Sequence, residues 1–223
     1  MEKEKPKPKK RGRPKQGETR EPIKPTILQK QKELQTVEKK LSLVSQECGV
    51  GIKQNSKGNR EVWIGGKLHI SVVDGDIPVT AFYSGANVHD SSVALPLMQE
   101  TSKRVKYLYD LQDAGYDADI IRKFSYKLGH RPIIDINPKN SKELKAKIEL
   151  LSHEKKTFKY LNQHLNCEEV HYNQRSMVER VNKYLKDDFG CDKIYYQGAT
   201  KVASVLAFGI LSICIHQSLQ FVT

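Results

Sequence analysis

Hydrophobic and polar positions alternate from residue 61 onward in the way that β-strands require. The runs EVWIGGKLHISVV and IPVTAFYS stand on either side of the turn sequence DGD, and two such runs around an Asp-Gly turn predict a β-hairpin. Farther along, SSVALPLMQETSKR and DADIIRKFSYKLG have helical spacing and alternate with the apolar runs VKYLYDL and RPIIDIN. Strands that alternate with helices after a first hairpin predict a layered α/β or α+β domain, which we assign to residues 61–223.

The residues before the hairpin fall into two parts. Residues 1–25 contain ten Lys or Arg, four Glu and five of the nine prolines of the chain. They carry too few apolar side chains to fold alone, which predicts a flexible arm. Residues 26–44 have apolar side chains at near-helical spacing and precede the Gly/Asn/Ser-rich run GVGIKQNSKGN, so we expect an inserted helix and a loop across residues 26–60.

Further helical patterns occur nearer the C-terminus. Residues 138–168 are Lys-rich and helical in pattern, whereas IYYQ after Cys191 fits either a short strand or a loop. The run VASVLAFGILSICIHQSLQFV at residues 202–222 is long and apolar enough to suggest a membrane span, but it contains His216, Gln217 and Gln220. These polar residues and the basic remainder of the chain favour a buried C-terminal helix that closes an α/β core, with no membrane as a partner.

The charge of the chain indicates a polyanionic partner. The formal net charge is +12 and the sequence pI is about 9.4; the ten positive and four negative side chains of residues 1–25 supply half of this excess. Such a balance is typical of proteins that bind DNA or RNA. The run Arg11-Gly12-Arg13-Pro14 resembles the core of an AT-hook, whose arginines enter a narrow A·T minor groove. The alternative is a basic linker that touches phosphates without selectivity.

Cysteine usage indicates neither disulfides nor a zinc site. The chain has four cysteines with no CxxC spacing and no secretory leader before them, namely Cys48, Cys167, Cys191 and Cys214. This predicts reduced thiols in an intracellular compartment. His164, Cys167 and His171 are close in sequence, but a structural zinc site takes four ligands, so we expect no zinc.

One predicted helix, HYNQRSMVERVNKYLK at residues 171–186, carries a narrow polar stripe. At about 100° per residue, and with Tyr172 at zero, Arg175 falls at roughly 300°, Glu179 at roughly 340° and Lys186 at roughly 320°. A separate apolar set on this helix can pack on a core: Met177, Val178, Val181, Tyr184 and Leu185. Taken alone, the stripe is as typical of a solvent-exposed face with ion pairs as of a functional surface.

A second candidate lies in the run YLYDLQDAGYDADII. Asp113 comes just after a hydrophobic strand and before Ala-Gly-Tyr and a helix, a place from which a carboxylate projects beside the edge of a sheet. Asp110 in the same run is a competing candidate. The structural alternatives are that Asp113 only starts a turn or that Asp117 caps the following helix.

The two candidates together carry a family resemblance. Asp113 in the pattern D-x-G-Y is followed sixty-six residues later by Glu179 in Y-x2-R-x3-E-x6-K, which Tyr172, Arg175 and Lys186 complete without a gap. This combination resembles the bacterial DDE transposases of the broad IS4-like family of insertion sequences. The segment GGKLHISVVDGDIPVTAFYSGANVHDSSVALPLM and the run RGRPK are similar to segments of the same family, so the resemblance covers about residues 5–220.

The resemblance implies an RNase H-like fold, a mixed five-stranded sheet with helices on both faces, in which three carboxylates hold two Mg²⁺ ions, or Mn²⁺ in their place. Such ions prefer oxygen ligands, and a pair of them suits in-line cleavage and strand transfer of DNA. In this interpretation Asp113 and Glu179 are catalytic metal ligands, Arg175 and Lys186 bind DNA phosphates, and Tyr172 stacks on a base or binds a phosphate. The implied partners are transposon ends and target DNA, with a homodimer that pairs the ends in the bacterial cytoplasm, at the nucleoid.

The first acid of that family has no counterpart in this chain. Residues 1–73 contain no aspartate, and no candidate before Asp113 has the first acid's Asp-Ser/Gly-Thr context; these candidates are Asp74, Asp76, Asp90 and Asp110. The first two fit a turn around Gly75, and Asp90 fits a helix cap. We therefore expect an N-terminally truncated transposase that lacks the first core strand and is inactive alone. The alternative is a non-catalytic DNA-binding remnant that uses its basic arm, including Arg11 and Arg13; an RNA nuclease on the same fold ranks lower.

Overall fold

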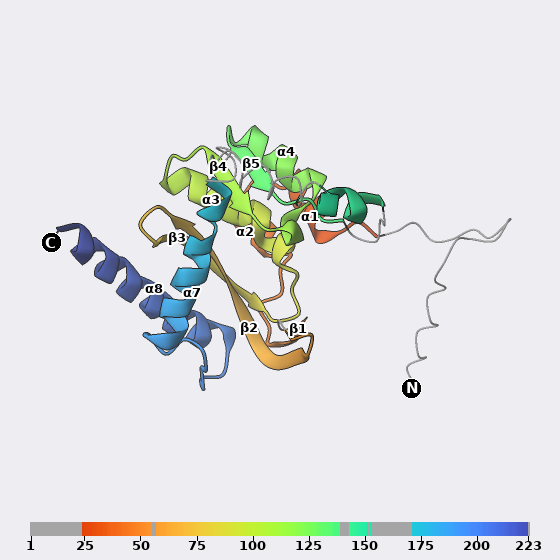
Figure 1. Ribbon diagram of the computed structural model, residues 1–223. Helices are drawn as coiled ribbons and strands as arrows, with labels where there is room; N and C mark the ends of the chain where they lie inside the picture. The colour runs from red at the N-terminus through yellow and green to blue at the C-terminus, as the bar shows by residue number, and fades with distance from the viewer. Residues whose placement is uncertain (1–23, 55–56, 139–142, 151, 153–170, 223) are drawn as a thin grey trace, which may run out of the picture.

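The computed structural model describes residues 24–54, 57–138, 143–150, 152 and 171–222. The chain forms a mixed α/β structure in which helices surround two small sheets (Figure 1), as the sequence pattern predicts. The AT-hook-like run, nearly all of the predicted arm and most of the Lys-rich segment lie outside the described residues. Within the Lys-rich segment, residues 143–150 are helical as predicted.

The first sheet is antiparallel and has three strands, in the order β1 (Gly49–Gln54), β2 (Arg60–Val73) and β3 (Ile77–Gly85). The pairing changes between Gly65 and Gly66: β1 pairs with the part of β2 before this point and β3 with the part after it. In the turn between β2 and β3, Gly75 and Asp76 have φ angles of 82° and 57°, the left-handed conformations that a tight hairpin requires. The predicted hairpin is confirmed, whereas β1 occupies a glycine-containing run that we expected to be a loop.

The second sheet consists of two parallel strands, β4 (Tyr109–Gln112) and β5 (Arg131–Ile134), which are connected through helix α4 (Asp119–Lys127). Within the described residues these strands form a sheet of their own, so the single five-stranded sheet that the resemblance implies is not observed. Because Gln112 lies opposite Ile134 in a parallel pair, the residues that follow the two strands, Asp113 and Asp135, stand at the same edge.

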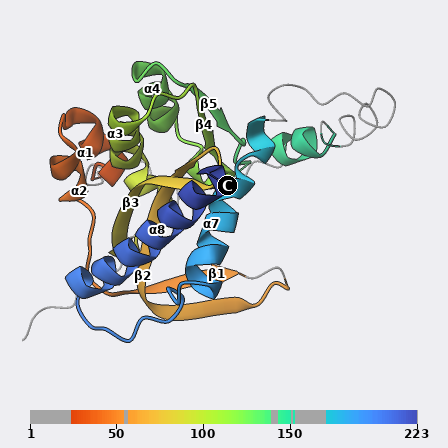
Figure 2. The same ribbon diagram turned by 90° about the vertical axis from the view of Figure 1, so that its left-hand side faces the viewer.

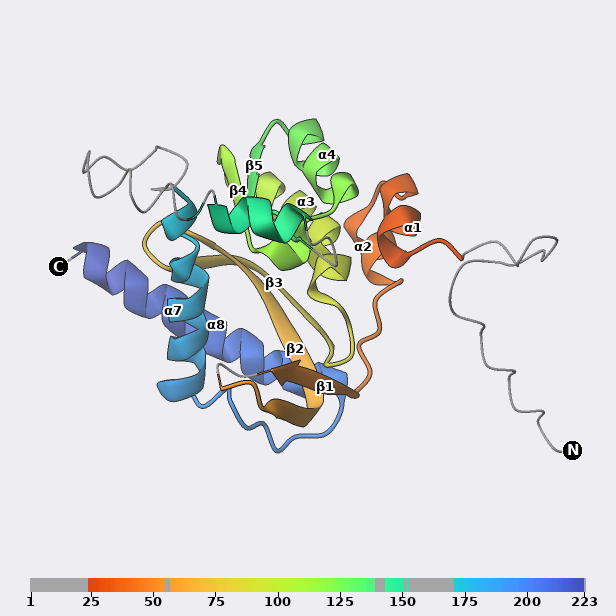
Figure 3. The same ribbon diagram turned by 45° about the vertical axis from the view of Figure 1, so that its right-hand side comes forward.

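The remaining described helices are α1 (Ile27–Glu33), α2 (Val37–Leu41), η1 (Asp90–Val93), α3 (Ala94–Arg104), η2 (Ala114–Tyr116), α7 (Ser176–Asp187) and α8 (Ala199–Val222). α1 and α2 lie beside α3, far from the C-terminal end of α8 (Figure 3). α7 packs on β2, and α8 packs on β3 and α7 (Figure 2). IYYQ, at residues 194–197, is part of the loop between α7 and α8.

The single helix expected at residues 26–44 is divided into α1 and α2. Each has its own N-cap: Thr26 accepts a hydrogen bond from the N–H of Gln29, and Thr36 accepts one from the N–H of Lys39. Leu34 ends α1 with extended backbone angles, φ −86° and ψ 139°. A second threonine cap therefore restarts the helix, and the continuous apolar spacing of the sequence conceals this break.

Three buried clusters hold the elements together. The first joins α3, α4 and β5 through Ala94, Leu95, Met98, Ile121 and Ile134. The second joins β2, α7 and α8 through Ile70, Val181, Leu185 and Ile213. The third includes Val93 of η1 and consists of Val44, Val88 and Val93. Each large apolar side chain buried in this way stabilises the fold by about 1.5–3 kcal/mol, so the second cluster is what fixes α7 against the hairpin.

The C-terminal helix α8 corrects one prediction. We expected a buried helix, but only one face is buried, at Leu206, Gly209, Ile213 and Gln217. Large apolar side chains on the rest of the helix, among them Phe208 and Leu219, are exposed. By length and composition alone, α8 is also the one helix in the described part of the chain that could cross a membrane. An apolar sequence indicates that a helix can pack against other elements, but it does not indicate which of the helix faces does so.

Candidate active site and nucleic-acid interface

Asp113 is an exposed residue at the end of β4, where the strand passes into η2. Its carboxylate accepts a hydrogen bond of 2.9 Å from the backbone N–H of Gly115, so it starts the turn that the sequence Asp-Ala-Gly-Tyr makes. A carboxylate has two oxygens that accept hydrogen bonds or bind cations. The structural role in the turn is therefore compatible with a functional one.

Asp110, three residues earlier, belongs to the core and is excluded as the competing candidate. It is 7% exposed, and its Oδ2 accepts a hydrogen bond of 2.5 Å from the Ser125 hydroxyl and lies 3.2 Å from Nδ1 of His130. The carboxylate thus ties β4 to α4 and to the residue before β5. Asp117 does not cap α4, as one alternative held, because it pairs with Arg122 at 2.9 Å.

The segment that carries the predicted polar stripe is helical with one interruption. Residues 171–173 are helical, residues 174–175 form a turn, and α7 begins at Ser176. The N–H groups of Gln174, Arg175, Met177 and Val178 bond to the carbonyl three residues earlier, which is the tighter winding of a 3₁₀ turn. The predicted helix is therefore interrupted by a turn at residues 174–175: Tyr172 lies in the helical segment before the turn, and Glu179 and Lys186 lie on α7 after it.

Three residues of the predicted stripe contact one another or a neighbouring acid. The Tyr172 hydroxyl donates a hydrogen bond of 2.6 Å to Asp135, and the Arg175 guanidinium lies 5.5 Å from the centre of the Tyr172 ring. Nη1 of Arg175 is 3.0 Å from Oε1 of Glu179. Burial and the Asp135 carboxylate raise the pKa of Tyr172 to about 12, so the hydroxyl stays a donor at neutral pH. Sequence reasoning missed Asp135, although it follows a strand just as Asp113 does.

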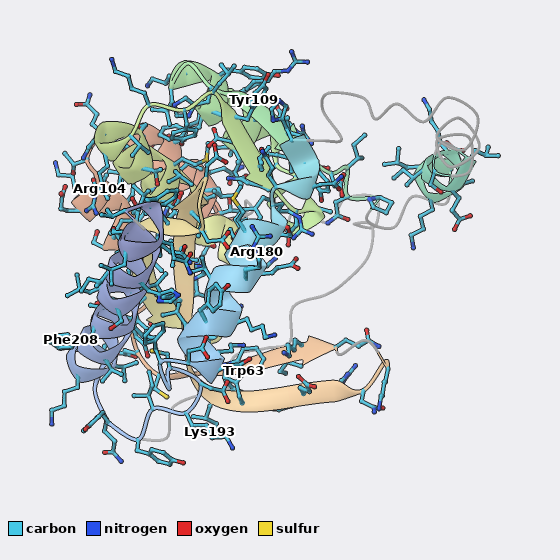
Figure 4. All side chains as sticks on the ribbon, turned by 60° about the vertical axis from the view of Figure 1, so that its left-hand side comes forward. Trp63, Arg104, Tyr109, Arg180, Lys193 and Phe208 are labelled. Atoms are coloured by element: carbon cyan, nitrogen blue, oxygen red, sulfur yellow. The ribbon has the colours of Figure 1, made fainter. Side chains whose placement is uncertain are left out.

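An ion pair adds a polar contact between α7 and the hairpin. Arg180 forms two bonds with Asp76, from Nη2 to Oδ1 at 2.7 Å and from Nε to Oδ2 at 2.8 Å, and Asp76 raises the pKa of Arg180. Figure 4 shows Arg180 on α7. Asp76 occupies the turn, as predicted, and also orients the helix that carries Glu179. No local pattern indicates this contact, because the partners are 104 residues apart.

A groove of about 1780 Å³ runs along β2, α7 and the loop after α7. Its lining includes four lysines (Lys53, Lys67, Lys186 and Lys193), an equal number of acids (Glu47, Glu61, Asp90 and Asp192), and exposed or half-buried aromatic side chains, among them Trp63, Tyr195 and Tyr196. Trp63 and Lys193 lie at the same end of the molecule (Figure 4).

Cations and exposed aromatic rings along one groove are typical of surfaces that bind nucleic-acid strands. Lys67 pairs with Asp90 at 3.2 Å, whereas Lys186 and Lys193 form no ion pair within the described ranges. Tyr195 is 89% exposed. Sequence reasoning selected Lys186 and missed Lys193 and the two tyrosines, which a basic and aromatic loop could have suggested.

The described residues do not assemble a metal site. No three His, Cys, Asp or Glu side chains in that part of the chain lie close enough together to hold an ion. Asp113 is engaged by Gly115 and Glu179 by Arg175. Mg²⁺ and Mn²⁺ require several oxygen ligands, so these residues as arranged do not fit two such ions. The assignment of Asp113 and Glu179 as joint metal ligands stays a prediction.

Comparison with known families adds one match. The family model described as "Transposase DDE domain" matches residues 9–215, nearly the whole chain, whereas no curated protein and no solved structure matches. The mixed α/β architecture is consistent with the RNase H-like domain of that family, and the predicted class of enzyme is confirmed. The chain therefore belongs to the family of transposases with a DDE domain, which are polynucleotidyl transferases and nucleases that act on DNA.

Proposed function

We propose that this chain is the DNA-binding part of an IS4-like insertion-sequence transposase and that residues 1–223 do not complete the catalytic site by themselves. The observation that carries the proposal is the exposure of the Glu179 side chain and its ion pair. Its side chain is 65% exposed and paired with Arg175, and within the described residues it belongs to no group of three metal-binding side chains. A carboxylate neutralised by a guanidinium has its charge satisfied without a cation.

Four other acids, three of them candidates for the first acid, have partners of their own. Asp76 is held by Arg180, Asp90 by Lys67, and Asp110 is buried against Ser125. Asp135, at the same strand edge as Asp113, accepts the Tyr172 hydroxyl. We propose that Asp113 and Glu179 hold a Mg²⁺ or Mn²⁺ ion only together with a further acid that the described residues do not supply.

The DNA contacts that we propose are sequence-independent. Lys186 and Lys193 line the groove beside β2, and a lysine there binds a phosphate as a point charge. When DNA is bound, Arg175 leaves Glu179 and binds a phosphate. The Tyr172 ring, which contacts the guanidinium, holds Arg175 in position. Arg11 and Arg13 belong to the arm, outside the described residues, where they add minor-groove or phosphate contacts.

A nuclease assay tests the catalytic part of the proposal. The chain of 223 residues is incubated with supercoiled plasmid and with end-labelled duplex DNA at several Mg²⁺ and Mn²⁺ concentrations, and nicking, cleavage and joining are measured on gels. We expect DNA binding by gel shift with no strand cleavage. Ion-dependent cleavage that Glu179→Gln and Asp113→Asn each abolish, while a Lys103→Gln control retains it, would contradict the proposal.

A second function, a non-catalytic DNA-binding protein, is favoured by the Arg175–Glu179 pair and by the charge of residues 1–25. The two readings differ in their response to metal. If Mg²⁺ raises the melting temperature and the double variant Asp113→Asn, Glu179→Gln removes the shift, the acids are a remnant of a metal site. If Mg²⁺ has no effect and DNA affinity falls on deletion of residues 1–25, the chain acts as a binding module. We place either activity on DNA in the bacterial cytoplasm, at the nucleoid.

A further inference from the structure

The helical segment before α7 is attached to the second sheet, whereas α7 itself is attached to the first. The His171 ring stacks on the Tyr109 ring of β4, with the ring centres 4.4 Å apart, and the Tyr172 hydroxyl donates a hydrogen bond to Asp135, the residue after β5. α7 packs on β2 through the second buried cluster. Residues 174–175 form the turn between these two attachments. A side chain in this turn is therefore placed by both sheets.

Arg175, in this turn, has an incomplete set of acceptors. Its guanidinium lies 5.5 Å from the centre of the Tyr172 ring, and its Nη1 is 3.0 Å from Oε1 of Glu179. Nε of the same side chain is buried and has no acceptor among the described residues. A buried donor without an acceptor costs free energy. A change of partner from Glu179 to a phosphate can therefore recover a hydrogen bond that the free protein lacks.

Asp135 is an exposed acid that forms no ion pair within the described ranges. Its Oδ2 accepts the hydrogen bond of the Tyr172 hydroxyl at 2.6 Å, a length typical of a bond to an ionised acceptor. This bond fixes the far end of the tyrosine ring, and the guanidinium of Arg175 lies against the same ring.

We propose that Asp135 is a positioning residue for DNA binding. Through the Tyr172 hydroxyl it holds the ring in place, and the ring holds the Arg175 guanidinium where a DNA phosphate reaches it. Asp135 itself does not touch the DNA. This inference rests on the proposed contact between Arg175 and a phosphate, and it adds the residue that orders this contact.

Charge and positioning predict opposite effects for the loss of Asp135. By charge alone, removal of a carboxylate near a phosphate-binding arginine removes a repulsion and strengthens DNA binding. By positioning, removal of the acceptor leaves the Tyr172 and Arg175 side chains free to move, so both have to be ordered when DNA binds. The sign of the change in affinity therefore decides between the two effects.

Fluorescence anisotropy of the full chain with a labelled duplex tests the sign. We expect Asp135→Ala to weaken DNA binding about tenfold, although the variant is more basic than the wild type. Asp135→Asn keeps an oxygen that accepts the hydroxyl hydrogen bond, so it should bind within about twofold of the wild type. Asp188→Ala removes an exposed aspartate at the end of α7 and is the control for charge; it should not weaken binding.

The route through Tyr172 and Arg175 has its own readout. Tyr172→Phe keeps the ring and removes the hydroxyl, so it should weaken binding as much as Asp135→Ala, and the double variant should be no weaker than either single variant. In an Arg175→Ala background, Asp135→Ala should no longer weaken binding. Losses that add in these combinations, or an Asp135→Ala chain that binds DNA as tightly as the wild type or more tightly, overturn the proposal.

Hydrogen exchange of the free protein tests the positioning step without DNA. Asp135→Ala and Tyr172→Phe should each speed amide exchange in the peptide that covers residues 171–178, whereas Asp135→Asn and Asp188→Ala should not; thermal melts check that all variants fold. Unchanged exchange in Asp135→Ala overturns the proposal. If Arg175→Ala binds DNA as tightly as the wild type, the proposed phosphate contact fails and this inference fails with it. If Arg175→Ala weakens binding and Asp135→Ala does not, this inference alone fails.

Discussion

Two aspartates three residues apart, Asp110 and Asp113, have opposite environments. The carboxylate of Asp110 is buried between Ser125 and His130, whereas that of Asp113 is exposed and caps a turn. Both follow the same apolar run, so the sequence left them as competing candidates. The residues that decide between them lie 15 and 20 positions later, and a local pattern carries no information about contacts at that separation.

A buried histidine in the groove, His69, gives the fold a defined pH dependence. It is 6% exposed, its Nε2 lies 2.7 Å from the Ser84 hydroxyl, and Lys67 and Asp90 are its charged neighbours. Burial lowers the pKa of His69, an effect that Lys67 reinforces and Asp90 opposes. Because the unfolded chain, with a histidine pKa of about 6.5, then binds the proton more tightly than the native state, stability is present above that pH and declines as the pH falls below it.

Urea unfolding at pH 7.5 and pH 5.5 measures this effect. We expect the free energy of unfolding to fall between the two values in the wild-type chain and to fall less in His69→Asn, which keeps a group able to bond Ser84. His216→Asn, at an exposed position on α8, is the control and should leave the difference unchanged. An equal decline in the wild-type and His69→Asn chains would exclude His69 as its source.

At the scale of elements, strands and helices with strong local patterns were predicted well. The β2–β3 hairpin follows from alternation around an Asp-Gly turn, and α3 and α4 follow from helical spacing. The failures have physical causes. A second threonine cap divides α1 from α2, a 3₁₀ turn at residues 174–175 interrupts the helix before α7, and the burial of α8 depends on neighbours that its own sequence does not specify. The candidate site residues stay a prediction, and the contacts of Arg175 with Glu179 and of Tyr172 with Asp135 were not predicted.

The contact between Arg180 and Asp76 is the element-scale feature that is easiest to test. It joins the centre of α7 to the β2–β3 turn through two bonds, but half of the Arg180 side chain is exposed, so solvent screens it. We expect Arg180→Ala to lower the free energy of unfolding by about 1 kcal/mol. Lys183→Ala, exposed on the same helix, should change it by less than about 0.5 kcal/mol.

A double-mutant cycle gives the specific readout for this ion pair. If the bidentate contact stabilises the fold, Arg180→Ala and Asp76→Ala together should cost less than the sum of the two single changes. Additive effects would mean that the two residues act separately, with Asp76 contributing only through its turn conformation.

For the molecule as a whole, the net charge accounts for a general affinity for DNA, whereas the fold determines where the basic side chains lie. The net charge of +12 is spread over the arm and the folded part, while the groove beside β2 concentrates Lys186 and Lys193 with exposed tyrosines. A family match over residues 9–215 agrees with both features. The basic arm was evident from composition, whereas the groove could not be predicted, because β2, α7 and the loop after α7 come together only in the fold.

Salt dependence of DNA binding divides these contributions. Each lysine that neutralises a phosphate adds about 0.9 to the slope of log K against log salt concentration, because it releases a condensed counterion. We therefore expect Lys186→Ala and Lys193→Ala each to reduce the slope by about one unit, measured by fluorescence anisotropy with a labelled duplex from 50 to 200 mM KCl. Lys103→Ala, on α3 and paired with Glu100, should leave it unchanged. Deletion of residues 1–25 should reduce the slope further, since ten basic side chains are lost with four acidic ones. If that deletion alone removed the whole salt dependence and neither lysine had an effect, DNA would be held by the arm and not by the groove.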